Sequence, residues 1–478
     1  MHLLQGRGGA GLAVARVATE TGTTWAALLS GRSGAVLGLI SAGIALHAFN
    51  QFAIVAALPL AAAELGGTAT FSWAYSLYFI GSIAGGTGAA AYRDRLGPRA
   101  GMILAALLFA LGGLLAISAP AFGWLLAGRM LQGVADGLIV AMCYSLIPAN
   151  FPPRAIARVF AIEAVVWAGA SLVGPLAGGL LAETASWRMS FLAVTPLVVA
   201  LPILTLLARP QVTVAAAVPL SLATIALSLL GALMLSLSSL SEVGAVQAAA
   251  VVASSVSFLA AIRLDGRLGP RLFPVGAFRL GSVVGRGFWV LLLMSASHSV
   301  GSVYLALMIH AVFGFRPAVV GYIIVLMALS WSVVAIVASR AVARPARHLL
   351  MRSGPLFQLA GFALLAAALG LQWSWLLVAG QLAIGTGFGV AWAGVNEAAM
   401  AAAPAEDRDR TGSLLPTVST AGYAIGASLA GMITTAAGLV PRLATGEIGE
   451  VAAWLYGTAG ALSVLAFLLG LRIRLPAA

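Results

Sequence analysis

The sequence predicts an all-α integral membrane protein with fourteen transmembrane helices. The first observation is composition, because 61% of the 478 residues are hydrophobic, only 8% are charged, and the mean hydropathy is +1.04. A soluble domain has about a quarter charged and roughly half apolar residues. The second is a succession of apolar runs near the length of about 20 residues that crosses a bilayer. The third is that arginines gather in alternate loops between these runs.

The apolar runs form two sets of six around a central pair. The first six helices are expected at 34–59, 70–92, 100–119, 121–147, 155–183 and 187–208. The central pair is expected at 218–240 and 246–264, within an insert at 209–287 that ends in a basic loop. The last six are expected at 288–312, 317–341, 353–371, 374–397, 412–438 and 448–472. Two six-helix halves, 34–208 and 288–472, around a midplane cavity are typical of a secondary transporter.

The arginines predict that both chain ends are cytoplasmic. The tails at 1–33 and 473–478 then lie inside, together with 22 of the 26 basic residues. Only Arg188, Arg316 and Arg442 fall outside, and Arg129 lies within a span. Such an asymmetry over short loops follows the positive-inside rule. The net charge of +12 therefore reflects topology and the anionic inner leaflet, and no nucleic-acid partner is expected.

The residue types that are missing exclude several chemistries. All 26 basic residues are arginines, so the chain has no lysine for a Walker phosphate loop or for a Schiff base. Cys143 is the single cysteine, which excludes an intrachain disulfide and a thiolate metal cluster. The histidines have no ligand spacing, so neither a metal nor a cofactor is expected. Residues 1–33 lack a short apolar core with a cleavage site, and no removable signal peptide is expected.

Four segments of the first half carry a family resemblance. Residues 92–99 read YRDRLGPR and are similar to the G-x-L-A-D-R-x-G-R-R loop signature of the major facilitator superfamily. Residues 126–133, LAGRMLQG, resemble the R-x-x-Q-G signature of its proton-coupled members. Residues 169–179, GASLVGPLAGG, resemble its antiporter signature, with Ala170 in place of the first glycine, and Trp187-Arg188 with Phe191 open the sixth helix. The whole chain therefore resembles the fourteen-span drug:proton antiporters of that superfamily.

The resemblance implies a major-facilitator fold and a function in export. A small organic molecule, amphipathic or drug-like, would leave in exchange for protons by alternating access, through a monomer in the bacterial inner membrane that needs no cofactor. One alternative is a facilitator or proton-coupled uptake transporter of the same fold. A membrane-embedded enzyme is a weaker alternative, because the sequence has no nucleophile–base or metal constellation such as G-x-S-x-G or H-E-x-x-H, and no catalytic residue is proposed.

Buried charges in the fourth and fifth helices are the candidates for proton coupling. At 100° per residue Arg129, Gln132 and Asp136 share one helix face, and Asp136 lies near the midplane about 10 Å along the axis from Arg129. Desolvation and Arg129 would set its protonation as access alternates, unless Asp136 is only a permanently ionised partner of Arg129. Glu163 is a second candidate, unless it is only an acid that faces cytoplasmic water. Related antiporters usually have an aspartate where Asn50 stands, so coupling must shift to Asp136 or Glu163, or is lost.

Polar side chains at mid-depth are candidates to line the substrate cavity. Three share one face of the first helix at i, i+3, i+4 spacing, two share a face of the ninth helix, and one comes from the fourth. A single histidine in such a helix is more often a hydrogen-bonded packing residue than a proton carrier. The six side chains are His47, Asn50, Gln51, Gln132, Ser295 and His298.

Two motifs are expected to change contacts during transport. The acidic residue of the 92–99 loop and its arginines can form a charge latch that breaks in another conformation; this interpretation involves Asp94, Arg95, Gly97 and Arg99. In the fifth helix, glycines allow close approach and a proline bends the helix, which favours a segment that seals against another during rocking: Gly174, Pro175, Gly178 and Gly179. Gly178→Leu is accordingly expected to abolish transport without affecting folding.

Overall fold

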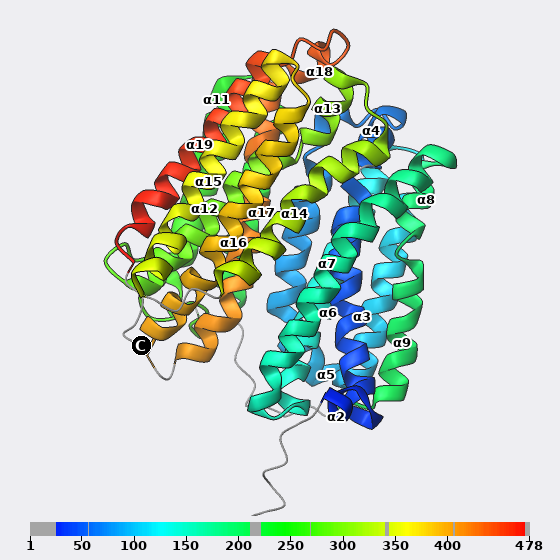
Figure 1. Cartoon of the computed structure of the whole chain (residues 1–478), viewed down its shortest axis with the longest axis vertical. Coiled ribbons are helices and arrows are strands. Elements are labelled where there is room, and N and C mark those ends of the chain that lie inside the picture. The colour runs from blue at the N-terminus through cyan, green and yellow to red at the C-terminus, as the bar shows by residue number, and fades with distance from the viewer. Residues whose placement is uncertain are drawn as a thin grey trace, which may run out of the picture.

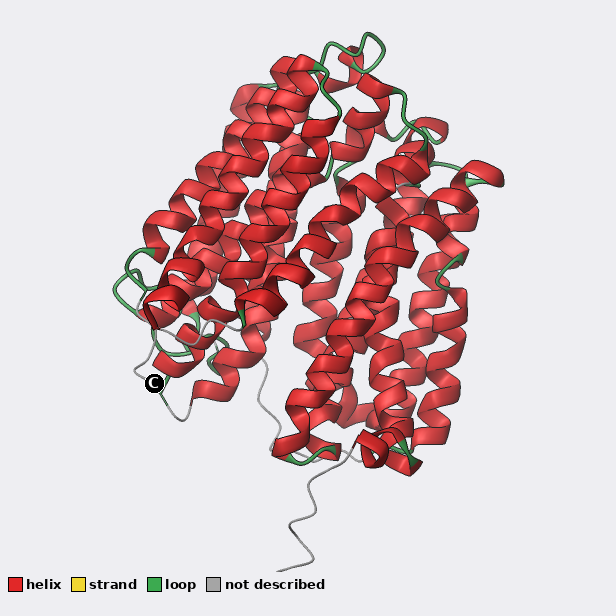
Figure 2. Ribbon diagram, viewed as in Figure 1, coloured by secondary structure: helices red, strands yellow, loops and turns green. Residues whose placement is uncertain are grey.

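The computed structural model describes residues 25–55, 57–210, 221–267, 269–339, 344–404 and 407–473. The described residues form helices joined by short connections, with no strand among them (Figure 2). The first group of helices comprises α2 (Trp25–Leu29), α3 (Gly31–Val55), α4 (Leu58–Glu64), α5 (Trp73–Ile117), α6 (Phe122–Asn150), α7 (Pro153–Thr184), α8 (Trp187–Leu192) and α9 (Thr195–Ala208). The central pair is α10 (Leu222–Leu237) and α11 (Gly244–Leu264).

The second group of helices follows the central pair. It comprises α12 (Val283–Ser302), α13 (Leu305–Phe313), α14 (Pro317–Ala338), α15 (Arg344–Leu371), α16 (Trp375–Ala402), α17 (Arg408–Ala436), α18 (Leu439–Arg442) and α19 (Gly449–Gly470). Short 3₁₀ turns stand at Thr68–Thr70 and Ser238–Leu240. Figure 1 shows the two groups side by side, close together at the top and diverging toward the bottom.

Twelve segments of the described residues are long and apolar enough to cross a membrane. They correspond to twelve of the fourteen expected spans. The other two expected spans, 70–92 and 412–438, lie in the first part of α5 and in α17, which are helical but are not among the twelve. The all-helical, multi-span prediction is confirmed, and the count of fourteen stays a prediction.

Helix α5 is a hairpin of two helices that meet at Gly97. This glycine has φ 76° and ψ 162°, a conformation that side chains with a Cβ rarely adopt, and Pro98 opens the second arm. Both arms contact α6: a Cβ on Gly85 would lie 2.0 Å from the Val134 carbonyl oxygen, and one on Gly112 would lie 2.7 Å from the Gly128 oxygen. The arms therefore run antiparallel, as expected for separate spans on either side of the 92–99 loop.

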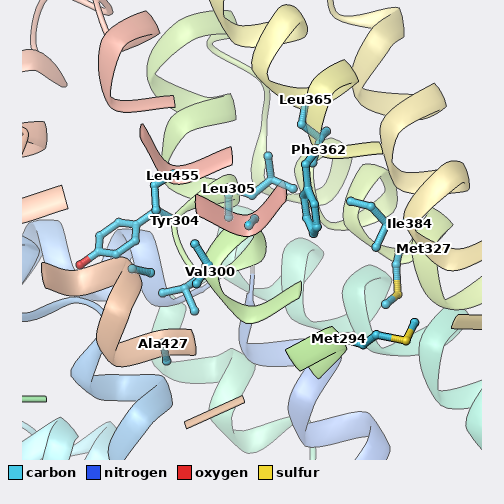
Figure 3. Close-up of a cluster of buried hydrophobic side chains, with 14 of the residues drawn as sticks. Met294, Val300, Tyr304, Leu305, Met327, Phe362, Leu365, Ile384, Ala427 and Leu455 are labelled. Atoms are coloured by element: carbon cyan, nitrogen blue, oxygen red, sulfur yellow. The ribbon is translucent and has the colours of Figure 1, made fainter. Parts of the chain in front are cut away.

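The second group has a hydrophobic core that extends into the first group at one end. Met294, Tyr304, Met327, Phe362 and Leu455 lie in this cluster, and Figure 3 shows these side chains spread among the helices of the second group. The same cluster includes residues of the first group near the ends of α3, α5 and α6 and near α4 and α8: Ile54, Leu58, Phe71, Phe122 and Trp187. In lipid, such close packing supplies the association that water would drive in a soluble protein.

Contacts between the two groups concentrate on α7 and on the first arm of α5. A Cβ on Gly179 of α7 would lie 2.7 Å from Ala318 Cα, and one on Gly321 of α14 would lie 2.9 Å from Pro175 Cβ. The rings of Phe79 and Tyr423 stack at 5.5 Å between α5 and α17. The α7–α14 contact lies where α7 ends and α14 begins, which is the end where the two groups approach each other in Figure 1.

Candidate functional site

Glycines allow α6 to pack closely against the first arm of α5, and this close packing positions the polar residues of both helices. A Cβ on Gly133 would lie 2.0 Å from the Tyr78 carbonyl oxygen, and one on Gly137 would lie 2.0 Å from the Ser82 oxygen. The backbones are therefore in contact at this level. Ser82 is thereby brought to Asp136, which directly precedes Gly137 in α6.

Asp136 is buried against the histidine of α3. Only 1% of its side chain is exposed, and its two carboxylate oxygens lie 2.9 and 2.8 Å from His47 Nδ1. Ser82 Oγ donates a longer hydrogen bond, 3.4 Å, to Oδ2. The His47 side chain is 18% exposed, so it is the more accessible member of the pair. His47 is thus the direct partner of the buried carboxylate.

The second ring nitrogen of His47, Nε2, contacts the side-chain amide of Gln51. Gln51 Nε2 lies 2.9 Å from His47 Nε2, so as placed the amide donates and the ring accepts, which puts the ring proton on Nδ1 facing Asp136. With the amide turned over, its oxygen would accept from a doubly protonated ring. The same positions therefore serve a neutral and a charged His47. The Trp167 ring of α7 meets the His47 ring edge-on at 5.4 Å.

Arg129 has partners other than a carboxylate. It is 3% exposed, and it donates from Nη1 to Gln132 Oε1 at 3.0 Å and from Nε to the Ala74 carbonyl at 3.2 Å. Its guanidinium carbon lies 4.1 Å over the Tyr78 ring. The hydrogen bonds of Arg129 thus go to Gln132 and Ala74 and not to Asp136, and the expectation that Arg129 sets the protonation of Asp136 stays a prediction. Two turns of α6 separate Arg129 from Asp136, whereas His47 of α3 contacts Asp136 directly.

Glu163 forms a separate buried site on α7. Its side chain is 3% exposed, and Ser41 Oγ of α3 donates to Oε1 at 2.8 Å. Oε2 is buried and has no hydrogen-bond partner among the described residues. Both side-chain polar atoms of Asn50 are likewise buried without a described partner. Asn50 and Gln132 are 0% exposed, so neither contacts an open cavity in this conformation.

In the second group of helices, the predicted polar residue His298 lies against an aromatic wall formed by Trp331, Phe388, Trp392 and Tyr423. The His298 ring lies edge-on to Phe388 at 5.7 Å and to Tyr423 at 6.1 Å. Trp331 stacks on Phe388 at 4.7 Å, and Trp392 lies 5.3 Å from Trp331. Sequence reasoning missed these aromatic residues, although the i, i+4 spacing of Phe388 and Trp392 on one helix was available as a signal.

Buried polar atoms in the same region are sparsely partnered. His298 Nδ1 is buried and makes no hydrogen bond with the described residues, and the buried Ser295 Oγ has the Tyr423 hydroxyl as its neighbour. Unpaired groups of this kind are costly in an apolar setting and suit a site that a polar ligand or water completes.

The two conformational motifs lie in different surroundings. Asp94 is exposed and its carboxylate lies 3.3 Å from Arg93, while Arg95 and Arg99 are exposed beside it. In α7 the glycines serve two faces: a Cβ on Gly174 or Gly178 would meet α3, whereas Gly179 and Pro175 contact α14. The contact of α7 with the second group of helices is therefore made by Gly179 and Pro175.

Glu64 of α4, outside the candidate spans, binds the start of α8. Its carboxylate accepts from Arg188 Nη1 at 2.6 Å and from Trp187 Nε1 at 2.7 Å. Arg188 also donates from Nε to the Ile117 carbonyl at 3.1 Å, which ties α8 to the end of α5. The hydrogen bonds from Arg188, and then from Trp187, hold the pKa of Glu64 below its ordinary value of 4.5.

Comparison with known protein families identifies the family of this chain. The model of the Major Facilitator Superfamily matches residues 40–404, most of the chain. The chain belongs to the major facilitator superfamily. Members of this superfamily are transporters and not enzymes, so this member is a multi-pass membrane transporter of small molecules. The family prediction is confirmed.

Relatives of this superfamily member include efflux transporters. A "probable multidrug-efflux transporter" of Mycobacterium tuberculosis strain H37Rv is 30% identical over 456 residues, which cover 91% of this chain and 93% of the relative. Among solved structures, an auto-inhibited peptide transporter of the POT family gives a TM-score of 0.67 at 16% identity, covering 92% of this chain and 98% of that one. A D-xylose–proton symporter gives 0.64 at 15% identity, covering 93% and 98%.

Proposed function

We propose that this chain exports a small amphipathic organic molecule from the cytoplasm of a bacterium in exchange for protons. The matched efflux relative supports export, since it aligns over nearly the full length of both chains. The observation that carries proton exchange is the His47–Asp136 pair, because the two titratable groups are in contact, one buried and the other partly accessible. The fourteen-span topology with both termini inside, the two six-helix halves at 34–208 and 288–472, and the inner-membrane location belong to the same proposal.

The pair works as a proton carrier because its charge states prefer different surroundings. A charge on His47 and a charge on Asp136 offset part of each other's desolvation cost as long as the two side chains stay in contact. Water or a substrate arriving from the cytoplasm weakens that attraction and changes which group keeps the proton. His47 stands on the helix whose usual acid is replaced by Asn50. It therefore returns a titratable group to that helix, although as a base.

The contacts between the halves support alternating access. The α7–α14 contact and the first-group residues of the shared hydrophobic cluster lie at the end that the arginine distribution assigns to the outside. Glu183 of α7 adds a hydrogen bond across the halves, accepting from the Ala318 amide at the start of α14 at 2.8 Å. We assign the structure to an inward-facing arrangement, in which rocking would break these contacts and join the inner ends.

The aromatic wall supports an amphipathic substrate. Aromatic faces accept flat apolar groups and cations, and the buried polar atoms of Ser295 and His298 supply a few directed contacts. An amphipathic molecule with a flat apolar part fits this combination. The walls come from α12, α14, α16 and α17, with Phe79 of α5 completing them from the first half.

A second candidate is a facilitator or proton-coupled uptake transporter of the same fold. The specific observation in its favour is Asn50, which is neutral where related antiporters usually carry an aspartate. A growth screen of toxic amphipathic compounds against cells that overproduce the chain would first identify a transported compound. Proteoliposomes with that compound then separate the candidates.

The decisive comparison varies only the direction of the pH gradient. With an acidic lumen, an antiporter concentrates the compound inside as protons leave, and lumenal pyranine reports alkalinisation that depends on the compound. Accumulation only with an acidic exterior would indicate a symporter. Equilibration that ignores the gradient would indicate a facilitator, and either of these results would overturn the proposal of antiport.

A further inference from the structure

A small cavity lies between the ends of three helices of the second half, far from the His47–Asp136 pair. Its volume is about 530 Å³, and it is lined by Val283, Arg286, Arg352, Leu471 and Arg472. These residues come from the start of α12, from the third turn of α15 and from the chain that follows α19. Three of the five lining residues are arginines, and none is acidic.

The arginines keep unused hydrogen-bond donors in this cavity. Arg286 donates from Nη1 to the Leu280 carbonyl at 3.1 Å, and Arg352 donates from Nη2 to the Ile473 carbonyl at 3.2 Å. These bonds anchor both guanidinium groups to backbone. The Nε atoms of both are buried and have no hydrogen-bond partner among the described residues. A buried guanidinium nitrogen without an acceptor is costly, so the site is incomplete as it stands.

The positive-inside rule alone does not account for this convergence. It requires arginines at this end of the molecule, but solvated ones satisfy it. Arg263 at the end of α11 and Arg267 in the basic loop that follows show that arrangement, since both are exposed. The anchored guanidinium groups of Arg286 and Arg352 repel each other unless an anion lies between them, and the exposed Arg472 adds a third positive charge to the lining. Their planar forks of donors match the oxygen atoms of a phosphate group.

We infer that this cavity binds the phosphate group of an anionic phospholipid. The surface beside it favours a lipid over a free anion. Leu356, one helical turn after Arg352 on α15, is 41% exposed. On α19, Leu465 and Leu468, which precede Arg472 in the chain, are 50% and 51% exposed. Acyl chains can lie along these side chains while the headgroup enters the cavity. Basic pockets between helices at the cytoplasmic side suit acidic headgroups in the same way.

The test is native mass spectrometry of the delipidated full-length chain in detergent, titrated with phosphatidylglycerol. The wild type is expected to bind one molecule of phosphatidylglycerol tightly, and phosphatidylcholine is expected to bind more weakly. The double variant Arg286→Gln/Arg352→Gln should weaken phosphatidylglycerol binding about tenfold or more, because the paired charge-assisted hydrogen bonds are lost. Arg267→Gln removes an exposed arginine and is the matched control, with a change below about twofold.

Two further arms keep the result interpretable. Thermal unfolding without lipid checks that the double variant is folded, and Arg286→Lys/Arg352→Lys, which keeps the charge but not the fork, should bind with intermediate affinity. Inorganic phosphate is titrated in parallel. If phosphate binds and the double variant abolishes that binding while phosphatidylglycerol is unaffected, the lipid is overturned as the occupant. If neither ligand responds to the double variant, the site itself is overturned.

Discussion

At the scale of single residues, His47 has two neighbours that define its role. Its Nδ1 faces a buried carboxylate and its Nε2 faces an amide, so the ring proton is directed toward Asp136. An asparagine side chain can place a donor near the position of Nδ1 but cannot take up a proton at neutral pH. This substitution therefore separates the hydrogen bond from the titration.

For His47→Asn we expect substrate exchange to continue while uphill transport is lost. One pH unit is worth about 1.36 kcal/mol per proton, which supports about tenfold accumulation of a neutral substrate by one-for-one exchange. The variant should fall to a ratio of about one in the proteoliposome assay. Gln51→Ala removes only the second partner of His47 and should keep most of the accumulation. Tenfold accumulation by His47→Asn would remove His47 from the coupling.

Glu64 gives a prediction with a defined pH dependence. Its pKa is lower in the folded chain than its ordinary 4.5, so its bonds to Arg188 and Trp187 stabilise the fold fully above about pH 4.5. The stabilisation is lost as the pH falls through the lowered folded pKa. Glu64→Gln should therefore melt at a lower temperature than the wild type at pH 7, and the two curves should converge below pH 4.5.

Thermal unfolding in detergent between pH 7 and pH 3 checks this expectation. Glu447→Gln makes the same change of charge at an exposed position and should leave the melting temperature nearly unchanged. A difference between Glu64→Gln and wild type that widens on acidification would have the wrong sign and would exclude the proposed tie.

Residue contacts were the least predictable level. Helical periodicity placed Arg129, Gln132 and Asp136 on one face, and all three are buried on α6. It could not show that His47 of α3 meets Asp136, because the relative height of two helices depends on packing between them. The same reason explains why Ser41 and Ser82 were missed as partners of the buried acids.

At the scale of elements, α7 packs against two different helices through two different faces. One face fits α3 within its own half and the other meets α14 across the halves. The glycine–proline pattern predicted close packing and sealing, but it did not distinguish these faces. Similarly, the apolar run and the 92–99 motif predicted a turn, and Gly97 with its positive φ is where α5 reverses.

The two faces of α7 predict different consequences for neighbouring glycines. A Cβ on Gly178 would lie 2.0 Å from the Ala53 carbonyl in the same half, so Gly178→Leu should destabilise the fold by about 1–3 kcal/mol. This revises the expectation that the variant folds normally. Gly179→Leu would instead push against Ala318 across the halves, and should slow transport while lowering the melting temperature less.

Thermal unfolding and transport measured on the same preparations distinguish these outcomes. Gly169→Leu is the control on the same helix, since a Cβ there meets nothing within 4 Å and both properties should be retained. Normal stability of Gly178→Leu together with normal transport by Gly179→Leu would show that α7 does not pack as described.

At the scale of the whole molecule, topology is the property most open to prediction from sequence. Hydropathy located twelve segments that the described structure also shows as apolar helices of sufficient length. It works because every backbone polar group in lipid must be paired within its own helix. The first arm of α5 and α17 are the two helices that are expected to span the membrane but are not among the twelve segments. Labelling of the loops tests whether they do.

Single cysteines in a Cys143→Ala background test that count. Pro270→Cys should react with an impermeant thiol reagent only from the cytoplasmic side, and Arg442→Cys only from the outside. Both reactions are compared in right-side-out and inside-out vesicles. Reaction of Arg442→Cys from the cytoplasm alone would contradict the fourteen-span topology.

The central claim, that Asp136 couples protons to export through His47, is tested most directly by one transport measurement. Wild type, Asp136→Asn and Glu163→Gln are reconstituted in parallel, and accumulation driven by an acidic lumen is compared with exchange at equal pH. Asp136→Asn keeps the shape but cannot titrate, so it should exchange substrate and accumulate none, while Glu163→Gln still accumulates. If Asp136→Asn accumulates substrate and Glu163→Gln does not, coupling belongs to α7. If both accumulate it, neither acid carries the proton and the account is contradicted.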